Sequence, residues 1–105
     1  MSDRIRKVNE LIRELVAESL AENISREYLF TVKAVETTRD LKHSVVWVSV
    51  MGDNDKFLDE LKQHQKEVRH FVTGKMVSKY TPLIEFKIDH SEEYVQHIEE
   101  LLREK

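Results

Sequence analysis

Apolar residues recur at helical spacing over the first part of the chain, with charged residues between them. Ser2 or Asp3 can cap the start of this helix, and Asn23 can end it because asparagine tolerates a left-handed backbone. The pattern predicts a helix over roughly residues 3–22. Its apolar face is formed by Ile5, Val8, Leu11, Ile12, Leu15 and Leu20.

A period of two, typical of half-buried strands, follows this helix. Within residues 28–37, the apolar Phe30, Val32 and Ala34 alternate with polar residues. Residues 38–42 are then few enough to join two adjacent antiparallel strands. We therefore expect a β-hairpin.

The second strand of this hairpin is rich in valine and stops at Gly52. Because successive side chains of a strand point to opposite faces, Val46, Val48 and Val50 share one face. The other face carries Val45, Trp47, Ser49 and Met51.

A second helical region begins after Gly52, with Asp53 or Asn54 as its cap. Residues 64–66 leave a gap in its apolar stripe, which predicts either a bend or an exposed turn, and Gly74 is a second possible break. The stripe consists of Phe57, Leu58, Leu61, Val68, Phe71, Val72 and Met76.

The end of the chain predicts one more strand and one more helix. Pro82 disfavours helix at the residue before it, and residues 83–89 alternate again. Ser91 caps a last helix, with acids in its first turn, where the macrodipole favours them. The order indicates a single α+β domain over residues 1–105, in which a right-handed crossover forms a three-stranded sheet with helices on one face.

In this arrangement Val46, Val48 and Val50 face the helices, and Trp47 lies on the opposite sheet face. We expect the first or last helix to cover Trp47. Two alternatives remain open, namely a platform for base stacking and a surface for a protein partner.

The composition narrows the class of protein. There is no cysteine, and 35% of the residues are charged. The N-terminus lacks the apolar core of a signal peptide, and no apolar run approaches the roughly 20 residues that span a bilayer. We expect a cytoplasmic protein without a membrane partner.

The net charge of −3 hides a segregation along the chain. Residues 61–82 hold five Lys or Arg and one acid, whereas residues 83–105 hold three bases and seven acids. Local charge of this kind can position an RNA backbone without reading its sequence, although a solvated helix face is the commoner explanation of such a run. The candidate RNA-binding residues are Arg39, Lys42, Lys62, Lys66, Arg69, Lys75 and Lys79.

Enzymatic and metal chemistry find little support in the sequence. The five histidines lack the i, i+4 spacing of zinc-binding helices, and Asp40 beside Arg39 has a more direct use in stabilising its turn. A small acylphosphatase-like enzyme would begin with a strand, whereas this chain begins with a helix. We expect no catalytic residues, metal site or cofactor.

Taken in order, these features resemble the bacterial ribosome-binding factor A family over almost the whole chain. The resemblance begins with the amphipathic first helix and rests on an ordered set of short motifs. They are Phe30-Thr31-Val32 with Val35, Thr38-Arg39-Asp40-Leu41, Val46-Trp47-Val48-Ser49 with Gly52, Val68-Arg69, Lys79, Thr81-Pro82, Phe86, Asp89-His90-Ser91 and Ile98-Glu99 with Leu101-Leu102.

The resemblance implies a type II KH-like fold with a kinked central helical pair. It also implies a non-enzymatic assembly factor that binds the free small (30S) subunit, is monomeric away from it, and assists late maturation and 5′-end processing of 16S rRNA, especially in the cold. Its partners would be 16S rRNA and neighbouring ribosomal proteins. The chain departs from the family pattern at the kink, where His64-Gln65-Lys66 replaces Ala-x-Gly, and at Val77, where an arginine is usual. A KH-like module that dimerises through the Trp47 face is the alternative.

Overall fold

The computed structural model describes residues 3–24, 26–76 and 82–90, which form two helices and a three-stranded sheet. The predicted last helix, capped by Ser91, lies outside the described residues. In chain order the elements are α1 (Asp3–Asn23), β1 (Leu29–Thr37), β2 (His43–Met51), α2 (Asn54–Lys75) and β3 (Leu83–Ile88).

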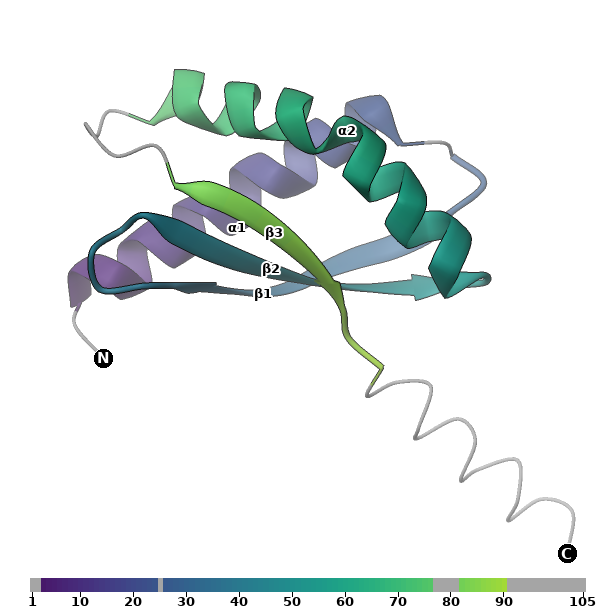
Figure 1. Cartoon of the computed structure of the whole chain (residues 1–105), viewed down its shortest axis with the longest axis horizontal. Helices are drawn as coiled ribbons and strands as arrows, with labels where there is room; N and C mark the ends of the chain where they lie inside the picture. The colour runs from purple at the N-terminus through teal and green to yellow at the C-terminus, as the bar shows by residue number, and fades with distance from the viewer. Residues whose placement is uncertain (1–2, 25, 77–81, 91–105) are drawn as a thin grey trace, which may run out of the picture.

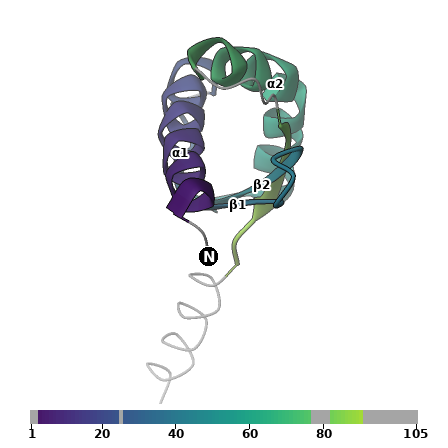
Figure 2. The same ribbon diagram turned by 90° about the vertical axis from the view of Figure 1, so that its left-hand side faces the viewer.

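The sheet has the order β1-β2-β3, with β1 antiparallel and β3 parallel to the central β2. Both helices cover the same face of this sheet (Figures 1 and 2). The predicted α+β architecture is confirmed for the described residues.

The core lies between this inner sheet face and the two helices. Val46 and Val48 are fully buried there, as the alternation predicts, and Val50 is half-buried. Phe57 of α2 is also fully buried and stacks at a tilt against Tyr28 and Phe30, with ring centroids 5.2 and 5.5 Å apart.

In β1 the predicted alternation breaks at a β-bulge. The register of β1 against β2 shifts between Val32 and Ala34, so the strand holds one residue more than its partner there. One extra residue moves every later side chain to the other face. The expectation that Ala34 shares the face of Val32 is therefore wrong, because Val35 is buried in its place and Ala34 is exposed.

The start and end of the helices follow local hydrogen bonding. The Asp53 carboxylate accepts a hydrogen bond from the Lys56 N–H at 3.1 Å, which confirms Asp53 as the cap of α2. The α1 helix ends at Asn23 as predicted, but for a different reason. The Asn23 side-chain amide donates a hydrogen bond to the Ser19 carbonyl at 2.8 Å. Asn23 does not adopt a left-handed backbone, because Leu41 is the only non-glycine residue with positive φ in the described chain.

The apolar gap at residues 64–66 lies inside one unbroken helix, since α2 continues to Lys75, one residue beyond Gly74. The axis of α2 nevertheless changes direction along its length as it crosses the sheet (Figure 1). In the gap, the side-chain amide of Gln65 donates a hydrogen bond to the carbonyl of Ile84 in β3. Gln65, a polar residue of the gap, thus connects the middle of α2 to the edge strand β3.

Candidate nucleic-acid interface

The middle turns of α2 carry three of the predicted cations close together. Lys62 and Lys66 are exposed and four residues apart, and the half-buried Arg69 follows three residues later. Residues three and four apart are neighbours on a helix surface, so these side chains form one stripe. Lys66 and Arg69 also line an open pocket of about 310 Å³ together with His70 and Thr73. A pocket with this lining can accept an anionic oxygen.

The acids and bases of α2 are distributed unevenly along the helix. The acids of α2 gather in its first two turns, whereas the bases gather toward its end, which the helix macrodipole favours. Glu67 follows Lys66 directly, and its Oε2 lies 2.9 Å from Nδ1 of His64. In the part of the chain that the structure describes, Lys62 and Lys66 have no ion-pair partner.

Lys75 stands at the last position of α2. Its ammonium group lies 5.8 Å from the centre of the Phe71 ring, and a cation in the last turn also stabilises the helix end. Lys75 is nevertheless exposed, so it remains accessible to an anion. The predicted Lys79 lies outside the described residues.

The β1–β2 hairpin presents Arg39 and Lys42 on an ordered turn. The Asp40 carboxylate accepts hydrogen bonds from the Thr38 hydroxyl at 2.6 Å and from the Lys42 N–H at 3.0 Å. Both hydrogen bonds stabilise the ionised carboxylate, that from Thr38 more than that from Lys42. They therefore lower the pKa of Asp40 below its ordinary value. The turn-stabilising role predicted for Asp40 is therefore confirmed, and Arg39 and Lys42 are both exposed.

Leu41 holds this turn in place. Its φ of 60° is costly for a branched side chain, yet the side chain is 6% exposed, so burial offsets the strain. The next residue, Lys42, accepts a hydrogen bond from the Leu83 N–H at 2.8 Å. The hairpin is thus connected to the start of β3.

The start of α1 carries a third group of cations, which the sequence analysis did not identify as part of the site. The fold places this group at the same end of the molecule as the hairpin. The start of α1, the hairpin and the end of α2 all lie at this end (Figures 1 and 2). The Thr37 hydroxyl donates to Asn9 Oδ1 at 2.5 Å, which fixes α1 against the hairpin. We call this region the cationic end, and it comprises Arg4, Arg6, Lys7, Arg39, Lys42 and Lys75.

A signal for this third group was present in the sequence. Arg4, Arg6 and Lys7 stand in the first turns of α1, where the macrodipole disfavours cations. Arg6 is compensated by Asp3 at 3.8 Å and Glu10 at 3.3 Å, and Lys7 is exposed. Because cations in the first turns do not stabilise α1, their presence there indicates a role in binding rather than in helix stability.

Trp47 lies on the outer face of the sheet and is half-buried. The expectation that the first helix covers it is wrong, because α1 packs on the inner face with Val46 and Val48. The Lys87 ammonium lies 5.5 Å from the centre of the Trp47 ring and shields part of it. The other expected cover, the last helix, lies outside the described residues.

In residues 3–24, 26–76 and 82–90, no cluster of three acidic or histidine side chains is arranged to hold a metal ion. Within the same residues, neither α1 nor α2 combines the length and the apolar character that crossing a bilayer requires.

The sequence matches the family model described as "Ribosome-binding factor A" over residues 4–102. A ribosome-binding factor A from Rhodopseudomonas palustris (strain BisB5) is 37% identical, over 97% of this chain and 80% of the relative. One from Opitutus terrae is 34% identical, over 99% of this chain and 88% of the relative.

Solved structures agree on the fold. The crystal structure of ribosome-binding factor A from Thermus thermophilus superimposes with a TM-score of 0.74 at 18% identity, covering 80% of this chain and 94% of that one. A Thermus thermophilus ribosome-binding factor A homology model, fitted into a cryo-electron microscopy map of a 30S–RbfA complex, gives a TM-score of 0.66 at 21% identity, covering 78% of this chain and 90% of that one. The arrangement of two helices on one face of a mixed sheet is therefore a type II KH-like fold.

Proposed function

The chain belongs to the ribosome-binding factor A family, a family of ribosome-binding factors rather than enzymes, and we propose that it acts in assembly of the small ribosomal subunit. It binds the free 30S subunit and assists late maturation and 5′-end processing of 16S rRNA, with its greatest effect in the cold. It works in the cytoplasm as one domain over residues 1–105 and is monomeric away from the subunit.

The observation that carries this proposal is the match to the family over residues 4–102, with relatives that align over nearly the whole chain. The cations of the interface add a physical basis. The stripe of Lys62, Lys66 and Arg69 and the cationic end together offer positive side chains from α1, the hairpin and α2. Lys79 completes the predicted set.

These cations would contact phosphates of 16S rRNA and set the orientation of the protein on the subunit. Arg39 and Lys42 project from a turn that its own hydrogen bonds hold in place, so little ordering entropy is lost when they bind. The pocket beside Lys66 and Arg69 would receive one phosphate oxygen.

The test is co-sedimentation of the purified protein with free 30S subunits and with assembled 70S ribosomes over a range of salt. We expect preference for free subunits. If roughly four phosphates are contacted, affinity should fall by about 50- to 150-fold when monovalent salt rises fourfold. Equal binding to both particles, or no binding at low salt, would contradict the proposal.

A second candidate is a protein module that dimerises through the outer sheet face. It rests on the directly paired Leu29 and Met51, which are 68% and 64% exposed on the face that also holds Trp47. Sedimentation velocity at rising concentration distinguishes the two functions, because only the second predicts a dimer.

A further inference from the structure

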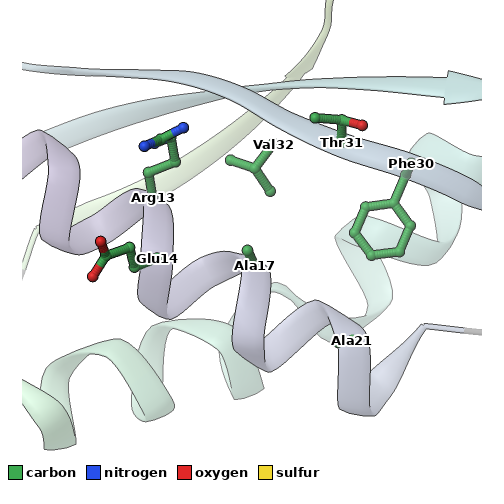
Figure 3. A pocket seen from close by; sticks show the side chains of 7 residues that line it. All are labelled: Arg13, Glu14, Ala17, Ala21, Phe30, Thr31 and Val32. Carbon is green, nitrogen blue, oxygen red and sulfur yellow. The ribbon is translucent and has the colours of Figure 1, made fainter.

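A cleft of about 480 Å³ lies between α1 and β1, outside the cationic interface (Figure 3). Its helix side is formed by Ala17 and Ala21, four residues apart, whose small side chains leave the space open. Its strand side is formed by Phe30 and Val32. The floor is apolar on both sides, and its volume lies in the range of about 300–1,000 Å³ that is usual for binding pockets.

The cleft reaches around the free edge of β1. Phe30 and Val32 point to the inner sheet face, whereas Thr31 points to the outer face, yet all three line the cleft. Among the described residues, β1 is hydrogen-bonded only to β2, so its other edge has backbone donors and acceptors outside the sheet ladder. Such an edge can pair with an added strand.

The β-bulge limits where pairing can occur. Because the register shifts between Val32 and Ala34, the regular part of the β1 edge beside the cleft spans residues 29–32. An added strand would therefore be short. Two residues of an extended strand advance about 6.8 Å, close to the roughly 6 Å between Ala17 and Ala21 along the helix. Two alternate side chains of the added strand would thus lie opposite the two alanines.

One end of the cleft carries an uncompensated cation. Arg13 extends from α1 toward β1, whereas Glu14 turns away from the strand (Figure 3). Arg13 has no ion-pair partner in the described residues. A guanidinium at the end of an apolar cleft favours a carboxylate on the occupant. A nucleic acid fits poorly, since Arg13 is the only cation among the described residues of the lining and would neutralise a single phosphate.

We propose that this cleft binds an extended segment of another protein, which adds a strand to the edge of β1. Two alternate apolar side chains of the segment occupy the cleft, and a carboxylate of the segment pairs with Arg13. The site is separate from the cationic end and does not depend on subunit binding.

The test uses the full chain labelled with ¹⁵N and three probes titrated to millimolar concentration. The first is a blocked six-residue peptide with valine at two alternate positions and aspartate at its end. The second replaces the aspartate with lysine, and the third is a uridine hexanucleotide. We expect the first peptide to shift amide signals of residues 29–32 and of α1 around Ala17 and Ala21, and to bind about fivefold tighter than the second.

Three variants make the test specific. Arg13→Asp should reverse the preference between the two peptides, and Ala21→Leu should weaken both by about fivefold or more because it fills the cleft from an exposed position. Lys56→Asp is the control, since it makes the same charge change on exposed α2 surface outside the lining and outside the cationic interface. Thermal unfolding of each variant checks that the fold is retained.

Three results would overturn the proposal. They are no shifts along β1 with either peptide, an unchanged preference in Arg13→Asp, and stronger shifts of the same amides by the hexanucleotide. The last result would make the cleft an RNA site. None of them bears on the preference for free subunits, so the two proposals stand or fall separately.

Discussion

Neutralising two residues of the α2 stripe tests the interface directly. Lys66 and Arg69 line the same pocket, and the change Lys66→Gln with Arg69→Gln removes both charges while keeping long side chains. Each phosphate contact contributes roughly 0.7 to 0.9 to the slope of log K against log salt. Loss of two contacts should therefore reduce the slope by about 1.4 to 1.8. At about 0.1 M salt, it should lower affinity for the free subunit by about 25- to 60-fold.

The assay measures the dissociation constant of fluorescently labelled protein for free subunits at several salt concentrations. Arg26→Gln with Lys56→Gln is the matched control. It makes the same change in net charge on two exposed residues, one just after α1 and one in the first turn of α2. The end of α1 and the start of α2 lie at the opposite end of the molecule from the hairpin (Figure 1). If only net charge matters, both double variants will behave alike.

The slope separates a lost contact from a lost fold. Arg69 is half-buried and has contacts within the protein, so the variant can be less stable. Partial unfolding lowers affinity by a similar factor at each salt concentration, whereas a lost phosphate contact changes the slope itself. A wild-type slope in the Lys66 and Arg69 variant would refute the assignment of the stripe.

Three further predictions concern the fold that carries this interface. Phe57→Ala should lower the free energy of unfolding by about 3–5 kcal/mol, because Phe57 is fully buried between two aromatic rings, and urea denaturation that shows less than about 1 kcal/mol would contradict this packing. Gln65→Ala should cost about 1–3 kcal/mol in the same measurement and speed amide exchange in β3, because the carbonyl of Ile84 loses its donor, and unchanged exchange would mean that this hydrogen bond adds nothing. The lowered pKa of Asp40 means that its stabilisation of the hairpin is present above the pKa of the unfolded chain, near 3.9, and is lost as pH falls through the folded value. The difference in unfolding free energy between wild type and Asp40→Asn should therefore shrink in acid, and a difference that is constant with pH would contradict the lowered pKa. A Thr38→Val variant should raise the pKa of Asp40 measured by NMR, because it removes the first hydrogen bond to the carboxylate.

The sequence identified much of the fold because its signals are local. The valines of β2 point inward as their alternation indicates, and Asp53 caps α2 as its position before the helix suggests. The register error in β1 shows where local reasoning ends. Val35 and Ala34 are adjacent, both fit a strand, and only pairing with β2 across a bulge decides which one is buried.

The candidate site likewise combines residues that the sequence predicts with residues that only the folded structure brings to it. Charge counting along the chain found the α2 stripe and the hairpin cations, but it could not join them to Arg4 and Lys7, which are more than 30 residues from the hairpin turn. The hydrogen bond between Asn9 and Thr37 brings these segments together. No run of residues announces the cleft beside Ala17, because a helix and a strand must pack before a small side chain leaves space.

The sequence by itself therefore determined the order and type of the described elements, which face of β2 enters the core and which half of α2 is basic. These features depend on residues within a few positions of one another and on the repeats of helix and strand. Only the tertiary structure decided the bulge in β1, the contact of Gln65 with Ile84, the gathering of cations at one end and the open edge beside α1. Each of these depends on atoms brought together from distant parts of the chain, where packing and backbone hydrogen bonding act across the fold rather than along it.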